Sequence, residues 1–260
     1  MLNALRRHFF SRKQLPFPSR IAELMQKRPR VLVLGVYLAD RPNSVAHLVP
    51  ALAKSIHCRV SQRWLAIKGE PPNPEVAAVT VGRLTGFVPK FILMNRLLKD
   101  SEDYDFIIFC DDDIVLPRGF MDAYISLQIE FDLALAQPAR TRNSHADHKF
   151  VLQRKGMRGR QTRFVEIGPL FSVRQDFAPS IMPFDEKSPM GWGYDYVWPL
   201  IAETQGLRIG IIDAAPVDHS LRDQAAAYSG SEAGLAMQAY LANRSFLKKQ
   251  EAFTVLESFS

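Results

Sequence analysis

The sequence has little cysteine and no long apolar segment. Its two cysteines, Cys58 and Cys110, allow at most one disulfide, and Cys110 lies within an apolar run, which favours two reduced thiols that pack as small hydrophobic side chains. No run approaches the roughly 20 apolar residues of a membrane span. Charged residues, Pro16 and Pro18 interrupt the apolar residues near the N-terminus, where a secretory signal needs them continuous. These absences predict a cytoplasmic protein.

Acidic residues are scarce at the N-terminus. The first thirty residues contain eight lysines and arginines against one acid, Glu23, and carry a charge of +7, whereas the other 230 residues sum to −1. A body without excess positive charge argues against nucleic-acid binding and for a separate basic arm, residues 1–30. Leucine and phenylalanine residues are interspersed in this arm. Two interpretations stay open: contact with the anionic inner face of a membrane, or a solvated and frayed terminus.

The rest of the chain has the composition of a soluble globular domain, with 47% hydrophobic and 23% charged residues. Short apolar runs alternate with helical patterns, which predicts one α/β domain with a parallel or mixed sheet covered by helices on both faces. A polar, basic loop is expected over 140–163. The expected strands are 31–37, 59–67, 77–81, 106–110, 133–139, 163–173 and 207–213, and the expected helices are 43–55, 89–98, 117–130, 191–206 and 230–250.

Three consecutive carboxylates follow the most apolar of these strands, in FIIFCDDDIVLP (106–117). Adjacent like charges raise one another's pKa unless a cation, hydrogen-bond donors or water compensates them. Oxygen-rich clusters of this kind suit Mg²⁺ or Mn²⁺. In parallel sheets ligands bind beyond the carboxyl ends of strands, which is where the triplet falls. A metal site is one interpretation, and a solvated loop whose acids cap the helix near Pro117 is the other.

Two more features accompany the acid triplet: a GWGYD turn (191–195) at a helix start, and an Asp-His pair (218–219) after a late strand. Together the three features resemble GT-A glycosyltransferases, with a turn segment similar to that of the β-1,4-galactosyltransferase type. Here one acid, Asp195, follows the turn instead of the Glu-Asp pair of that type. Over residues 31–222 the segments LAQPA, FVEIGPLFS, GWGYD and IGIIDAAPVDH also resemble, in order, a family widespread in plants and catalogued as domain of unknown function 707.

The resemblance implies a GT-A fold and a metal-dependent transfer of sugar from a nucleotide-sugar donor to a glycan or lipid-linked acceptor, as in polysaccharide biosynthesis. It divides the domain 31–260 into a nucleotide-sugar half (31–139), an acceptor and metal half (140–222) and a C-terminal helical segment (223–260). The implied roles are Asp195 as catalytic base of an inverting reaction; Asp111, Asp113 and His219 as ligands of Mn²⁺ or Mg²⁺; Asp40, Arg41, Lys90, Asp112 and Arg222 as nucleotide-sugar contacts; and Trp192, Gly193 and Tyr194 as acceptor contacts.

Several simpler roles compete with these. His219 has the alternative of a hydrogen-bonded loop histidine, Trp192 that of core packing, and Asp195 that of a helix cap. Because side chains alternate along an extended chain, Asp112 is expected to point away from Asp111 and Asp113. At the level of the whole protein, the alternatives are a phosphohydrolase of the HAD type and a catalytically inactive protein that only binds a sugar nucleotide.

Overall fold

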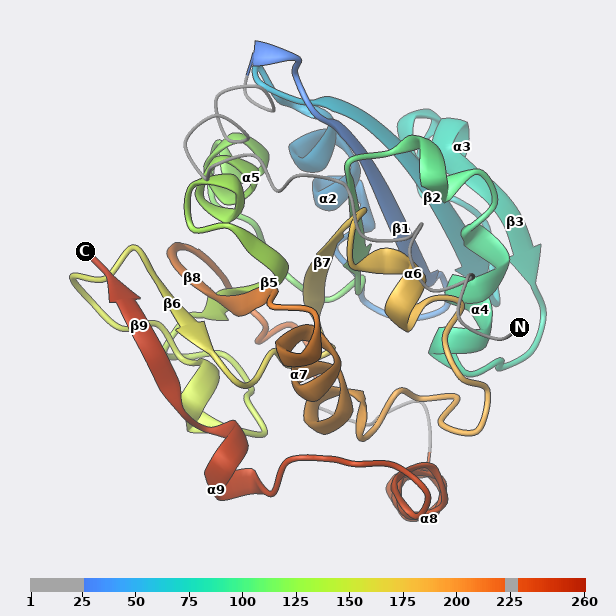
Figure 1. Cartoon of the computed structure of the whole chain (residues 1–260). Helices are drawn as coiled ribbons and strands as arrows, with labels where there is room; N and C mark the ends of the chain where they lie inside the picture. Colours follow the sequence, from blue (N-terminus) through green and yellow to red (C-terminus); the bar gives the residue numbers. More distant parts are fainter. Residues whose placement is uncertain (1–25, 223–228) are drawn as a thin grey trace, which may run out of the picture.

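A single mixed sheet organises the protein. The computed structural model describes residues 26–222 and 229–260, and within them nine strands form one sheet in the order β3-β2-β1-β4-β7-β5-β8-β6-β9 (Figure 1). The strands are β1 (Arg30–Leu38), β2 (Arg59–Ile67), β3 (Thr80–Leu84), β4 (Phe106–Cys110), β5 (Leu133–Arg140), β6 (Gly159–Thr162), β7 (Leu170–Arg174), β8 (Arg208–Val217) and β9 (Val255–Phe259). No helix among the described residues is long and apolar enough to cross a membrane.

Strand direction brings distant parts of the chain to one edge of the sheet. Strands β1, β2, β3 and β4 are mutually parallel, and β5 is parallel to β8. Strand β7 lies between β4 and β5 and is antiparallel to both. The carboxyl ends of β1, β4, β5 and β8 therefore share one edge with the amino end of β7. Every loop that leaves these strand ends can contribute to the same site.

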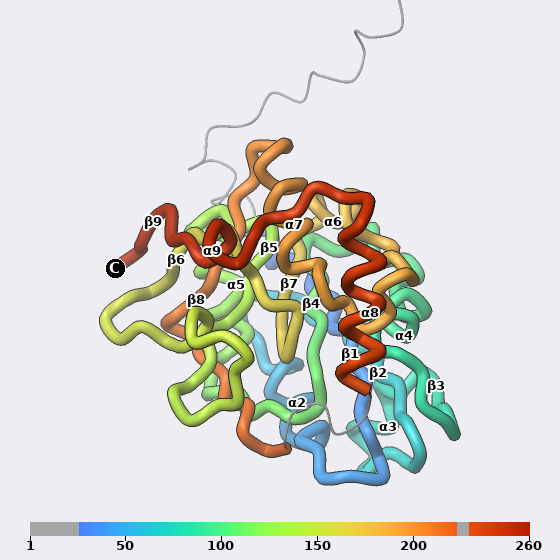
Figure 2. The backbone as a smooth tube through the Cα atoms, turned by 90° about the horizontal axis from the view of Figure 1, so that it is seen from below, coloured from blue at the N-terminus to red at the C-terminus, as the bar shows by residue number. Residues whose placement is uncertain are grey.

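Helices cover both faces, as the alternation of apolar runs predicts. They are α2 (Val45–Ala53), α3 (Pro74–Val79), α4 (Lys90–Leu97), α5 (Phe120–Glu130), α6 (Ala178–Ile181), α7 (Tyr194–Thr204), α8 (Gly230–Leu241) and α9 (Lys249–Ala252). Alternate residues of β4 enter different cores: Phe106 and Ile108 pack with α2 and α5, whereas Ile107 and Phe109 pack with α4 and α7. The segment from α8 to β9 runs across α7 (Figure 2), where Leu247 N donates to Tyr196 O over 2.9 Å.

Several expected elements differ from the structure. The expected strand 77–81 begins as helix α3, because Asn73 Oδ1 accepts a hydrogen bond from Val76 N at 2.9 Å and Pro74 occupies the first turn. The expected strand 163–173 forms only from Leu170. The expected helix 230–250 is interrupted between α8 and α9, and β9 follows it unpredicted. The basic arm lies outside the described residues except for residues 26–30.

Strand β6 forms inside the expected loop 140–163 because its buried charge is compensated. Arg160 is fully buried and its Nε donates to Asp213 Oδ2 at 2.8 Å, across the β6–β8 pairing. The same guanidinium donates to the carbonyl oxygens of Phe150 (3.0 Å) and Leu152 (3.2 Å). A buried charge is tolerated only when it is paired and hydrogen-bonded in this way. A polar four-residue strand gives no periodic signal of its own.

Packing between β1 and β2 generates the first prediction. Gly35 lies beside Trp64 in the parallel register, and the fully buried indole fills the space that a side chain at position 35 would need. We expect Gly35→Ala to lower the free energy of unfolding by about 1–3 kcal/mol through overpacking. Urea denaturation measures the loss. Gly86→Ala is the matched control, because its Cβ would meet no atom within 4 Å, and an equal loss in both variants would contradict the packing argument.

Candidate functional site

The acid triplet at the end of β4 is compensated by cations from two other segments. Asp112 is buried: its Oδ2 accepts a hydrogen bond from Leu38 N at 2.6 Å, and its Oδ1 pairs with Arg222. Arg222 Nη2 also lies 3.0 Å from Asp113 Oδ2. Asp112 was expected to point away from its neighbours, but the chain bends at 112–113 and one guanidinium bridges both carboxylates. Burial raises the pKa of Asp112 to about 6, even though Arg222 favours the ionised form.

Asp111 pairs with a different cation. Lys90 Nζ, at the start of α4, lies 2.5 Å from Asp111 Oδ1, and the lysine also approaches Ile167 O at 3.5 Å. Strand β7 begins at this point, since Asp111 N donates to Pro169 O over 2.8 Å. The two cations expected to contact a donor phosphate, Lys90 and Arg222, are thus both present at the triplet. Each of these cations forms an ion pair with a carboxylate of the triplet.

Asp113 and His219 face each other, as the metal hypothesis requires. His219 Nε2 lies 3.3 Å from Asp113 Oδ1, and the buried His219 Nδ1 has no hydrogen-bond partner. Burial acts to raise the pKa of Asp113, but His219 and Arg222 outweigh it and lower this pKa to about 2. A carboxylate oxygen and an imidazole nitrogen fit the donor preferences of Mn²⁺. Within the described residues no group of three acids, histidines or cysteines is arranged to hold a metal ion, and Asp111 is paired with Lys90.

The expected nucleoside contacts lie next to the triplet. Asp40 is exposed and Arg41 is partly exposed, just beyond the end of β1. Arg222 Nη1 donates to Pro42 O at 3.2 Å, and Ser44 N donates to Asp112 O at 2.6 Å. The loop that carries Asp40 and Arg41 is therefore tied to the carboxylates.

Asp195 lies apart from the triplet, in the first turn of α7. It is partly exposed, but its Oδ1 is inaccessible to solvent and has no hydrogen-bond partner. Burial raises the pKa of Asp195 to about 7, although backbone N–H groups at the helix start favour the carboxylate. Gly193, with φ +97°, forms the N-cap, a backbone conformation that favours glycine. A carboxyl group with this pKa can accept a proton near neutral pH.

The expected acceptor contacts around Asp195 do not all face outward. Trp192 is partly exposed, and its carbonyl oxygen accepts a hydrogen bond from Ser188 Oγ at 2.7 Å. Tyr194 is only 1% exposed, and its hydroxyl donates to Asp185 O at 2.6 Å. Its ring lies 4.8 Å from that of Trp198. The Tyr194 side chain therefore packs in the aromatic core, where it also borders a cavity, and its contact with an acceptor stays a prediction.

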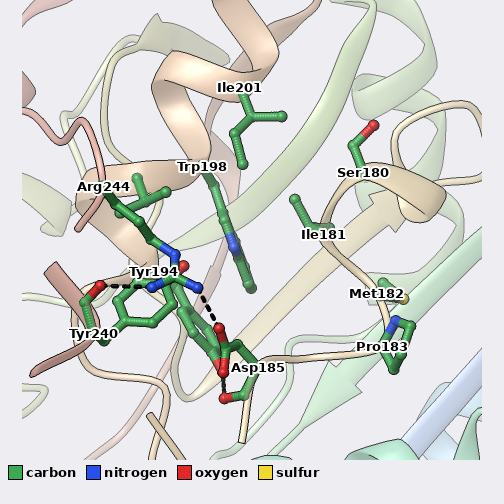
Figure 3. A pocket seen from close by; sticks show the side chains of 11 residues that line it. Ser180, Ile181, Met182, Pro183, Asp185, Tyr194, Trp198, Ile201, Tyr240 and Arg244 are labelled. Carbon is green, nitrogen blue, oxygen red and sulfur yellow. Dashed lines mark hydrogen bonds and ion pairs between the residues drawn. The ribbon is translucent and has the colours of Figure 1, made fainter. Parts of the chain in front are cut away.

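A cavity of about 200 Å³ lies on another face of α7 (Figure 3). Trp198 and Ile201 line one side, Ile181 and Met182 the other, and the ion pair of Arg244 with Asp185 lies at its border. Residues 194, 197, 198 and 201 form one helical stripe, and Asp195 falls outside it. The cavity is therefore separate from the carboxylate site.

Sequence reasoning missed two charged residues between the triplet and Asp195. Arg140, at the end of β5, is 3% exposed, and Glu166, ahead of β7, is 6% exposed. Arg140 Nη2 pairs with Glu166 Oε2. Burial raises the pKa of Glu166 to about 8 even though Arg140 favours its ionised form. The available signal was an acid within the otherwise apolar run FVEIG, which needs a partner when the run is buried.

Solved structures share this architecture. No protein-family model matches the chain, and no curated protein matches it in sequence, so the narrower family resemblance is not confirmed. Glucosyl-3-phosphoglycerate synthase from Mycobacterium tuberculosis, in complex with Mg²⁺ and uridine diphosphate, is similar with a TM-score of 0.54 at 11% identity, over 84% of this chain and 82% of that one.

Two further solved structures are similar to this chain in fold. The same synthase with Mn²⁺, UDP-glucose and phosphoglyceric acid gives a TM-score of 0.52 at 11% identity, over 92% of both chains. GalNAc-T7 with UDP, GalNAc and Mn²⁺ gives 0.54 at 9% identity, over 76% of this chain. This chain spans 44% of the GalNAc-T7 chain. At such identities the likeness concerns the fold: the chain is a single α/β domain with the GT-A fold of glycosyltransferases.

Proposed function

We propose that this protein is a metal-dependent glycosyltransferase that moves a sugar from a nucleotide-sugar donor to a glycan or lipid-linked acceptor with inversion. One observation carries the proposal: Asp113 and His219 face each other within a compensated acid cluster at one sheet edge, and a further carboxyl group, Asp195, lies on a different element, in the first turn of α7. The GT-A fold supports the proposal, because solved structures with this fold contain UDP together with Mn²⁺ or Mg²⁺. The same fold gives no support to a phosphohydrolase of the HAD type.

The acid cluster supplies the donor side of the reaction. When the anomeric carbon–oxygen bond breaks, negative charge grows on the leaving diphosphate. A divalent cation held by Asp113 and His219, with Asp111 as a further ligand, would offset this charge as a Lewis acid. Lys90 and Arg222, released from their carboxylates, could then contact phosphate oxygens. Asp112, buried against Leu38 N, would instead keep the loop in place.

Asp195 supplies the acceptor side. An acceptor hydroxyl oxygen attacks the anomeric carbon from the face opposite the leaving diphosphate, and its proton passes to a base. Such a base must stand apart from the metal ligands, and Asp195 does so at the start of α7. Its unpartnered Oδ1 and a pKa of about 7 suit a group that gains a proton during the reaction. A catalytically inactive protein that only binds a sugar nucleotide remains the competing proposal.

The acid cluster predicts that nucleotide binding requires a divalent cation. Calorimetric titration of the protein with UDP, and in parallel with GDP, should show binding with Mn²⁺ or Mg²⁺ and a large loss of affinity in EDTA. Asp113→Asn should weaken the Mn²⁺-dependent binding. Asp103→Asn, an exposed acid before β4, is the control and should bind as the wild type does. Equal affinity with and without EDTA would remove the metal role of Asp113 and His219.

Asp195 predicts a kinetic defect without a loss of fold. Asp195→Asn should lower transfer by roughly 10²–10⁴-fold, the usual contribution of a general base, while donor affinity stays unchanged. Because the base acts in its ionised form, wild-type kcat/KM should rise with pH and level off above about 7, and the variant should lose this limb. Assays use sugar nucleotides with an acceptor panel.

The control for Asp195 is Glu203→Gln, on the last turn of the same helix, which should transfer at the wild-type rate. A helix cap alone would give a different result: Asp195→Asn would lose about 1 kcal/mol of stability and keep its turnover. Retention of the donor's anomeric configuration in the product would exclude the single-displacement scheme.

The basic arm predicts attachment to membranes. Seven net positive charges among leucine and phenylalanine residues should bind anionic lipid, and would bring the enzyme to a lipid-linked acceptor at the inner face of the membrane. Co-sedimentation with phosphatidylserine-containing vesicles should fall when salt is raised, and also when residues 1–25 are deleted, which removes a net charge of +4 from the arm's +7 and leaves strand β1 whole. Neutral vesicles are the control. Unchanged sedimentation of the truncated protein would reject this role.

A further inference from the structure

We propose that Arg140, held by Glu166, is a positioning residue that ties the two walls of the carboxylate site together, so that His219 and Asp111 are presented to the same ligand. The inference rests on the proposed function for its ligand, but the tie itself is a property of the chain. Arg140 stands at the end of β5, between the segment that follows β8 and the segment that precedes β7.

The guanidinium of Arg140 contacts both walls directly. Its Nη1 donates to His145 O at 2.7 Å, and its Nη2 donates to Gly168 O at 2.6 Å and pairs with Glu166. The planar fork of arginine can serve several acceptors at once in a fixed geometry, which lysine cannot do. With a side chain only 3% exposed, Arg140 makes these contacts out of water, where they are least weakened by solvent.

The first wall carries His219. His145 N donates to His219 O at 2.9 Å, and His219 N donates to Ser144 Oγ at 2.9 Å. Thr141 Oγ1 donates to Asp218 Oδ2 at 3.1 Å. The backbone of the Asp-His pair is thus held by the segment 141–145. Arg140 fixes that segment through the His145 carbonyl.

The second wall carries Asp111 and Lys90. A Cβ at Gly168 would lie 3.4 Å from Asp111 Oδ2 and 3.7 Å from Lys90 Nζ, so the backbone of Gly168 is packed against this ion pair. Asp111 N donates to Pro169 O in the next residue. Because Arg140 Nη2 donates to the Gly168 carbonyl, it fixes the backbone against which Asp111 rests.

Glu166 keeps Arg140 in place. Its backbone N–H donates to the buried Gln137 side chain, and its Oε2 faces Arg140. Its Oε1 is buried without a hydrogen-bond partner. Burying such an ion pair adds little to stability, since desolvation offsets the attraction. The presence of this ion pair is therefore better explained by the geometry that it imposes on the two walls of the site than by a contribution to stability.

Hydrogen exchange tests the tie without any ligand. In Arg140→Met, the backbone amides of Asp111, His145 and His219 should all exchange faster, although they lie on separate segments. The matched control is Arg174→Met, which removes another buried arginine, paired with Asp132 and Asp176 at the opposite end of β7. The control should lower the melting temperature without affecting these three amides. Unchanged exchange in Arg140→Met would overturn the proposal.

Calorimetry tests the consequence for binding. Direct hydrogen-bond partners of metal ligands typically contribute 10–100-fold to metal affinity, and Arg140 acts on the ligands through the neighbouring backbone, so Arg140→Met should weaken Mn²⁺-dependent UDP binding by about tenfold, the lower end of that range, and leave binding in EDTA unchanged. Arg140→Lys should recover little of the lost UDP affinity. Glu166→Gln, a milder change, should also lower the UDP affinity. Equal UDP affinity in Arg140→Met and Arg174→Met would reject the positioning role. Absence of UDP binding by the wild type would instead reject the proposed function. Hydrogen exchange would still test whether Arg140 links the two walls.

Discussion

The compensation of three adjacent carboxylates at the end of β4 is the constraint on which the site depends. Asp112 satisfies its charge with the backbone N–H of Leu38, at the end of β1, and with Arg222, which follows β8. Neither partner is near Asp112 in the sequence. The ends of three strands must therefore meet before the charges are neutralised. In this way an electrostatic requirement and the topology of the sheet specify the same place.

The apolar strands could be predicted because their signal is local. The runs 31–37 and 106–110 are apolar at every position, as expected for strands buried on both faces, and the structure has β1 and β4 there. Strands β6 and β9 could not be predicted in the same way. Three of the four residues of β6 are polar, and β6 becomes a buried strand only because Asp213, on β8, neutralises Arg160. A pattern within β6 cannot report a partner 53 residues away.

The candidate site shows the same division. Asp113 and His219, which only the resemblance relates to each other in the sequence, lie face to face in the structure, and their role as metal ligands stays a prediction. The ion-pair partner of Asp111 could not be predicted, because Lys90 lies at the start of helix α4, whereas Asp111 follows strand β4. The packing of Tyr194 could not be predicted either, because a tyrosine that follows a glycine turn can face the core or the solvent; here its ring packs against Phe91, Phe184 and Trp198.

Helix α7 combines a buried stripe with a partly exposed residue, Asp195, in its first turn. Its buried stripe packs into the core, while its first turn presents Asp195 at the edge of the sheet. The core fixes the helix, and the helix fixes the carboxyl group. The Oδ1 of Asp195 is buried without a hydrogen-bond partner, and such an unfavourable arrangement persists only where the surrounding structure holds it.

The ion pair between Arg222 and Asp112 has a consequence for the order of folding. Its partners are separated by 110 residues in the sequence. Bringing them together costs loop-closure entropy, which opposes the contact until both halves of the sheet have formed and joined. Early contacts such as those between β1 and β2 can build the N-terminal half, residues 31–139, with native strands and helices. That half contains Lys90, the partner of Asp111, but leaves Asp112 and Asp113 without the guanidinium of Arg222. The compensated cluster is therefore completed at the last stage of folding, and its appearance during refolding times the joining of the two halves.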